Sequence, residues 1–110
     1  MQIQSETKDN ITVVRPEGNL DTNTSTGAQE YLNKAIDEGA AKLVVSFDKV
    51  DFVSSAGLRV LLATAKKLGG IGGELRVCGL NETVAEVFEI SGFSTILNVY
   101  GSESEALSGL

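Results

Sequence analysis

Two adjacent serines are the side chains in this sequence whose type and position could do chemistry. Ser54 and Ser55 stand in the stretch DFVSSAGLR (residues 51–59), between an apolar pair and a turn of small residues. A hydroxyl can act as an activated nucleophile or cap a helix. The chain has no histidine and one cysteine, which excludes a Ser-His-Asp triad, a Cys-His pair, a histidine metal site and a thiolate cluster.

Three other motifs fail as catalytic or nucleotide sites. VSSAG departs from the hydrolase turn G-x-S-x-G, because Val53 or Ser54 takes the place of the first glycine and no histidine can activate either serine. The glycines of LGGIGGEL follow a helix and precede a strand, whereas glycines that cradle phosphate follow a strand and precede a helix. Cys78 lies in an apolar strand, which favours a buried thiol over a reactive one.

The residues after the serines favour a surface that another protein could approach. One serine is enough to cap the helix that begins here, a contribution of about 1 kcal/mol. Gly57 gives up helix propensity, about 1 kcal/mol relative to alanine in a helix interior. We interpret Ala56 and Gly57 as leaving the helix start bare beside the hydroxyls. Asp21, between a strand and a helix, is either an Asx-type turn or part of a partner-facing site.

Composition limits the partners and the compartment. The chain has 110 residues, is 42% hydrophobic and carries a net charge of −6, so residues 1–110 predict one domain with a modest core. An acidic surface repels phosphate backbones and anionic lipids, so neither nucleic acid nor a membrane is expected as a partner. We see no signal peptide and no apolar run of the roughly 18–20 residues that a bilayer requires. A single cysteine is consistent with a reducing cytoplasm.

Alternating strands and helices must position the two serines. Residues 2–16 predict two short strands, with Pro16 at a strand end or edge. A helix is predicted between the candidate N-caps at 22–24 and Gly39, with apolar residues at helical spacing from 28 to 36. KLVVSF (42–47) is a nearly unbroken apolar run, typical of a central strand buried on both faces. After the serines, an apolar stripe from Leu58 to Leu68 predicts the next helix.

The second half of the chain continues the alternation. ELRVCG (74–79) predicts a strand, NETVAEVFEISG (81–92) a helix and TILNVY (95–100) a last strand. Ser102 and Glu105 have capping-box spacing for a short final helix. The expected order is β-β-α-β-α-β-α-β-α. It predicts an α/β fold with a mainly parallel, mixed sheet and helices packed on it.

This order and the stretch VDFVSSAGLRVLL resemble the STAS domain of anti-sigma-factor antagonists, a likeness that extends from about residue 10 to residue 100. Members carry D-S-[ST]-[GA]-L-like residues at a helix start, and the first serine after the acid is phosphorylated. The resemblance matches Ser55 to that serine, with Ser54, in place of the acid, as the runner-up. Ala56 and Gly57 match the residues that follow, and EGNLDTNTS matches Asp21 to an aspartate of the family's G-x-[LI]-D segment.

The resemblance implies a bacterial, cytoplasmic partner-switching protein that is a substrate and not an enzyme. Unphosphorylated, such an antagonist binds an anti-sigma factor that is also a serine kinase, and a sigma factor is freed. Phosphorylation releases the antagonist, and a PP2C-type phosphatase resets it. The resemblance implies no cofactor for this chain, because ATP and Mg²⁺ would belong to the kinase. Alternatives are an accessory STAS domain that binds a small ligand or a constant partner, and a scaffold subunit of a sensory assembly.

Sheet geometry adds an expectation about docking. Loops that leave the carboxyl ends of parallel strands gather at one edge of an open α/β sheet. Ser55 is expected to follow the KLVVSF strand and Asp21 the strand pair before it, which would bring both to that edge. Arg59 would offer a charge on the outer face, and Gly57 would leave room for the partner. We therefore expect the kinase to dock over this helix start and the turn around Asp21.

Overall fold

A mixed six-stranded sheet organises the chain in the computed structural model, which describes all residues 1–110. The strands are β1 (Gln2–Lys8), β2 (Ile11–Leu20), β3 (Lys42–Ser46), β4 (Lys49–Val53), β5 (Glu74–Cys78) and β6 (Asn98–Tyr100). The helices are α1 (Ser25–Asp37), α2 (Ser55–Gly69), α3 (Glu82–Ile90), α4 (Phe93–Ile96) and α5 (Glu103–Leu107).

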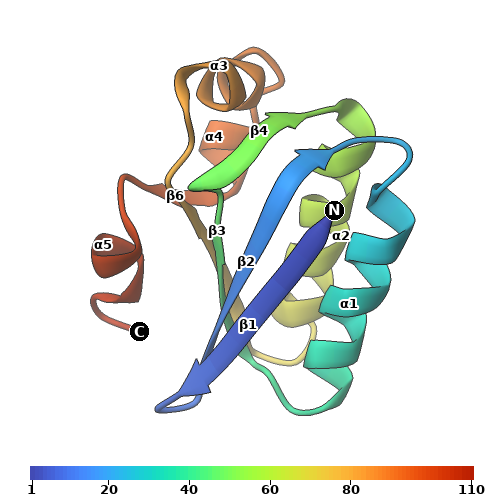
Figure 1. Ribbon diagram of the computed structural model, residues 1–110. Helices are drawn as coiled ribbons and strands as arrows, with labels where there is room; N and C mark the ends of the chain where they lie inside the picture. The colour runs from blue at the N-terminus through green and yellow to red at the C-terminus, as the bar shows by residue number, and fades with distance from the viewer.

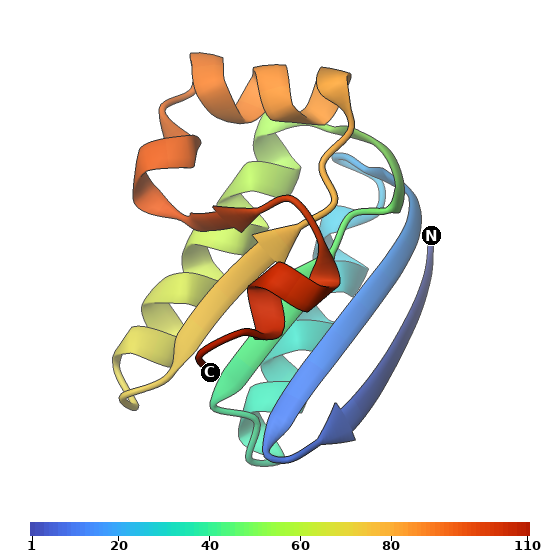
Figure 2. The ribbon, with the colours of Figure 1, turned by 90° about the vertical axis from the view of Figure 1, so that its left-hand side faces the viewer.

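The strand order is β1-β2-β3-β5-β6, and β4 pairs with the far end of β2. β1 is antiparallel to β2, and every other pairing is parallel. Helices α1 and α2 cover one face of the sheet, α5 lies on the other, and α3 and α4 lie toward the end occupied by β4 (Figures 1 and 2). The expected α/β class with a mainly parallel mixed sheet is confirmed. None of the helices is long and apolar enough to cross a bilayer.

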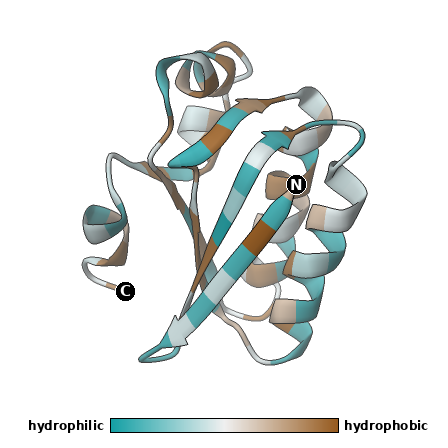
Figure 3. Cartoon of the chain, viewed as in Figure 1, coloured by the Kyte–Doolittle hydropathy of each residue, from teal (hydrophilic) through white to brown (hydrophobic).

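The main core fills the space between the sheet and its helices. It contains 19 buried residues, among them Phe47 and Phe88, whose rings meet edge to face with centroids 5.9 Å apart. Residues 43–46 of β3 are buried, and the strand lies between β2 and β5, which confirms the prediction for KLVVSF. The outer strand β1 is largely hydrophilic (Figure 3). The core therefore joins the sheet to α1 and α2 along their length and to α3.

A second, smaller cluster lies under α5. Val13, Val44 and Cys78 are buried there beneath Ala106. Arg15 of β2 holds the start of α5, because its Nε and Nη2 donate to the two carboxylate oxygens of Glu103 at 3.0 and 2.7 Å. The short final helix predicted from its capping residues is confirmed, since the Ser102 hydroxyl accepts the Glu105 N–H at 3.2 Å. The structure also confirms that Cys78 is buried.

Three local expectations are wrong. The sequence 49–53 forms an additional strand, β4, where only a connection to the serines was expected. Residues 93–96 form the short helix α4, so the last strand is shorter than 95–100. Pro16 lies inside β2 and not at its end or at a sheet edge. It stands between the part of β2 that pairs with β3, through Val14, and the part that pairs with β4, from Glu17, so its missing N–H interrupts neither ladder.

Candidate functional site

The ends of β2 and β4 bring Asp21 and the two serines together. Leu20 is paired with Val53 in the parallel ladder, and the Ser54 N–H donates to the Leu20 carbonyl at 2.9 Å. The chain enters α1 and α2 from these adjacent strand ends (Figure 1). The two loops therefore share one edge of the sheet, as expected. The expected route was wrong, because Ser55 follows β4, whereas β3 ends nine residues before it at Ser46.

The two serines play different structural parts. Ser54 is the N-cap of α2, with extended backbone angles, and its Oγ accepts the Gly57 N–H at 3.4 Å. Its carbonyl accepts the Leu58 N–H at 2.9 Å. Ser55 is the first residue of the helix and is exposed, and its hydroxyl makes no hydrogen bond within the chain. The capping role that one serine could fill thus belongs to Ser54, and the Ser55 hydroxyl is free.

Gly57 corrects the sequence interpretation. It is buried, and a Cβ atom at this position would lie 2.6 Å from the Leu20 carbonyl oxygen and 2.7 Å from Val53 Cγ2. The glycine therefore allows the first turn of α2 to pack closely on the ends of β2 and β4. The sequence led us to expect that Gly57 leaves room for a partner, and this expectation is wrong. Ala56 is half-buried, so the exposed part of the helix start is narrower than expected.

Asp21 forms the Asx-type turn that the sequence allowed. Its Oδ1 accepts the N–H of Asn23 at 2.9 Å and that of Thr24 at 3.3 Å. The Thr24 hydroxyl accepts the Asp21 N–H at 2.9 Å and donates to the Asn19 carbonyl at 2.8 Å. These bonds brace the loop between β2 and α1. Asp21 is half-buried beside Ser54, so its structural part does not remove it from the surface at this edge.

Arg59 supplies an exposed, unpaired cation one helical turn after Ser55. The ion pairs of the chain use Arg15, Lys67 and Arg76 but not Arg59. Helix α2 carries no acidic residue, although the chain as a whole is acidic. The start of α2 therefore combines a free hydroxyl, helix N–H groups and a positive charge.

Phe52 belongs to the same edge but was not among the expected partner-facing residues. Its side chain is 42% exposed, and it is paired with Asn19 across the ladder. The strand period could not have indicated it, because Asp51 next to it is exposed as well and the alternation is interrupted there. An exposed aromatic ring beside a free serine adds apolar area to this surface.

Two side chains with shifted pKa values, Cys78 and Glu103, lie away from this edge. Burial raises the pKa of the Cys78 thiol to about 11, which keeps it protonated near neutral pH. The hydrogen bonds from Arg15 hold the pKa of Glu103 below its ordinary value. Both groups belong to the packing of α5 on the sheet.

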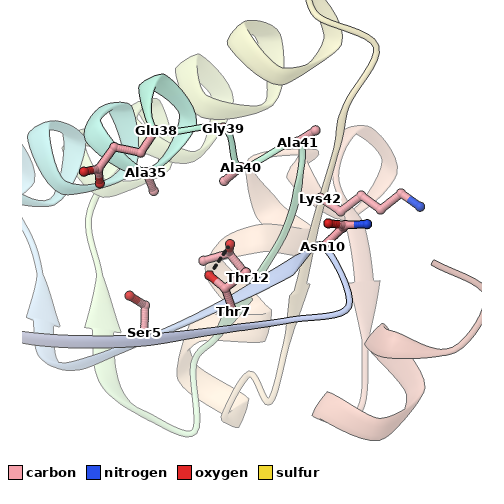
Figure 4. Close-up of a pocket in the computed structure, with 10 residues that line it drawn as sticks. All are labelled: Ser5, Thr7, Asn10, Thr12, Ala35, Glu38, Gly39, Ala40, Ala41 and Lys42. Atoms are coloured by element: carbon pink, nitrogen blue, oxygen red, sulfur yellow. Dashed lines mark hydrogen bonds between the residues drawn. The ribbon is translucent and has the colours of Figure 1, made fainter.

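A polar hollow lies at the opposite end of the sheet. It has a volume of about 510 Å³ between the starts of β2 and β3 and the end of α1 (Figure 4). The hydroxyls that line it are already partnered: Thr7 bonds Thr12, and Ser5 bonds Tyr31. Its position separates it from the serines.

Comparison with known proteins identifies the family. Residues 2–106 match the STAS domain family. A Bordetella bronchiseptica chain, BtrV, provisionally named an anti-sigma factor antagonist, is 35% identical over 96% of this chain and 91% of its own. The anti-sigma F factor antagonist of Paenibacillus polymyxa is 32% identical over 100% of this chain and 95% of its own. The Bacillus cell fate determinant SpoIIAA in its phosphorylated form, 24% identical over 96% of each chain, superposes with a TM-score of 0.73.

Proposed function

This chain belongs to the STAS domain family, and on that premise we propose that it is an anti-sigma factor antagonist switched by phosphorylation of Ser55. In the unphosphorylated state it binds an anti-sigma factor with serine kinase activity, and a sigma factor is freed. The kinase phosphorylates Ser55 and the complex dissociates. A PP2C-type phosphatase then restores the binding form. These reactions take place in the cytoplasm, and the chain is their substrate.

The free hydroxyl of Ser55 carries this proposal. Ser54 already caps α2, so phosphate on Ser55 would break no hydrogen bond that holds the fold. Phosphorylation adds about −1.5 to −2 charges at pH 7. The first turn of a helix tolerates negative charge, because its N–H groups and the macrodipole favour an anion. The folded domain should therefore accept the modification.

The same phosphate would oppose the complex. Binding to the kinase brings the edge formed by the ends of β2 and β4 out of water, and a dianion at that edge must lose hydration. The group also adds bulk at a position that is open in the unmodified chain. One modification can thus leave the fold intact and abolish the interface.

The resemblance to the family matches Ser54 to an aspartate, and the capping bond of Ser54 supports the assignment of the phosphate to Ser55. Serine and aspartate are both good N-cap residues, because each offers an oxygen to an N–H of the first turn. Replacement of aspartate by serine therefore keeps the cap and does not change which residue matches the phosphorylated serine of the family. We therefore assign the phosphate to Ser55 and keep Ser54 as the cap.

We propose that the partner docks on the surface formed by Asp21, Ser54, Ser55, Ala56 and Arg59, with Phe52 at its margin. The exposed ring of Phe52 and the free guanidinium of Arg59 provide the two kinds of contact that interfaces favour, aromatic and cationic. Gly57 is buried and contributes no exposed area to this surface. Its close packing against Leu20 and Val53 fixes the position of the helix start that carries the other residues.

Charge reversal tests the docking surface. Asp21→Lys and Arg59→Glu should each weaken binding of the unphosphorylated chain to its kinase at least about fivefold by calorimetry. The effect should be larger at low salt, because exposed charges are screened. Glu86→Lys and Glu89→Lys, on the exposed side of α3, are the matched controls and should change the affinity less than about twofold. Loss of affinity in the controls with retention in the other pair would place the docking surface on α3.

A further inference from the structure

Arg59 lies where it can reach a phosphate on Ser55. The two residues are four positions apart on α2, a helix of 15 residues, and both are exposed. Side chains at this spacing are neighbours on a helix surface, with Cβ atoms about 5–6 Å apart. Residues 55–59 contain no acid, and Arg59 makes no ion pair in the unmodified chain.

Backbone donors complete the surroundings of such a phosphate. Of the first N–H groups of α2, that of Gly57 is used by the Ser54 hydroxyl and that of Leu58 by the Ser54 carbonyl. The N–H groups of Ser55 and Ala56 have no acceptor within the chain. Two open N–H groups of the first turn and the unpaired guanidinium four residues on are therefore available to a phosphate on Ser55.

We propose that Arg59 is an intramolecular clamp for phosphorylated Ser55. A guanidinium offers a planar fork of donors that matches two phosphate oxygens, which favours a bidentate pair over a single contact. The inference rests on the proposed function, because it concerns the phosphorylated form of the same site. It makes the switch act twice: phosphorylation places charge in the interface and also withdraws the cation that the unphosphorylated chain offers to its partner.

Nearby carboxylates do not occupy Arg59 beforehand. Asp21 accepts two backbone N–H groups of its own loop. Asp51, on β4, is exposed, and neither acid forms an ion pair with Arg59. Both acids repel a phosphate equally in the wild-type chain and in a variant that differs only at Arg59. A comparison between these chains therefore isolates the contribution of the guanidinium.

The test uses full-length chain with phosphoserine incorporated at position 55 during synthesis, so it depends on no kinase. Phosphorus NMR then follows the second pKa of the phosphate, which is about 6 for free phosphoserine. A cation that favours the dianion lowers this pKa. In Arg59→Gln the pKa should be higher than in the wild type by about 0.3 or more, a twofold change in the preference for the dianion.

Two further variants sharpen the result. Lys66→Gln removes an exposed cation from the same helix, three turns away, and should leave the phosphate pKa unchanged. Arg59→Lys keeps the charge without the fork and should retain part of the shift. Equal pKa values in the wild type and Arg59→Gln, or an equal effect of Lys66→Gln, would overturn the clamp. A kinase that modifies another residue would overturn the proposed function instead, and this measurement would still decide the clamp.

Discussion

Replacement of Gly57 by alanine should destabilise the domain, although the same change usually strengthens a helix. A methyl group at this position would lie 2.6–2.8 Å from the Leu20 carbonyl oxygen, Leu20 Cγ and Val53 Cγ2, well inside van der Waals contact. Overpacking of this kind costs about 1–3 kcal/mol, against a gain in helix propensity of up to about 1 kcal/mol. We expect the free energy of unfolding to fall by about 1–2 kcal/mol and the melting temperature by about 5–10 °C.

The Gly57→Ala variant also has a local readout. The Leu20 carbonyl that would be displaced is the acceptor of the Ser54 N–H, so amide exchange at Ser54 should accelerate more than exchange across the rest of α2. Gly27→Ala is the matched control, because this glycine lies in α1 with no atom within 4 Å of the added methyl group. It should raise stability by up to about 1 kcal/mol. If calorimetry and urea unfolding find Gly57→Ala as stable as the wild type, the close approach of α2 to the strand ends is refuted.

The remaining predictions concern charge. Ser55→Asp should leave the melting temperature within about 4 °C of the wild type and weaken kinase binding at least about tenfold, whereas a fall of more than about 8 °C would make Ser55 structural. Because Arg15 lowers the pKa of Glu103 below its ordinary 4.5, this pair stabilises the fold above that pH and ceases to do so as the pH falls through the lower folded value. Glu103→Gln should therefore cost about 1 kcal/mol at pH 7 and almost nothing near pH 2 in urea unfolding, and an equal loss at both pH values would contradict this linkage.

The predictable parts of the fold are those with a strong period. The apolar runs of β3 and β5 and the stripe of α2 indicated their elements, because burial on one or both faces leaves a regular pattern. β4 was missed because two consecutive residues, Asp51 and Phe52, are both exposed. A regular strand alternates between buried and exposed positions, and this pair interrupts the alternation. The register shift between Gly18 and Asn19 of β2 accompanies this irregularity.

The candidate site was predictable in its location and less so in its details. Ser54, Ser55 and Asp21 were expected at one edge because loops after parallel strands gather there, and the pairing of β4 with β2 is what brings them together. Gly57 could not be interpreted correctly from the sequence, since a glycine at a helix start fits a bare surface and a tight packing contact equally well. Only the distances to Leu20 and Val53 separate these two possibilities.

Phosphopeptide mapping tests the central claim most directly. The chain is isolated from the cells that produce it, with and without phosphatase treatment, and a purified sample is incubated with the cognate kinase and ATP. We predict one phosphate, on Ser55, that phosphatase treatment removes and that Ser55→Ala abolishes. Phosphate on Ser54 alone would shift the assignment by one residue and contradict the division of cap and acceptor. No phosphate in either sample would contradict the switch and favour an accessory or scaffold role.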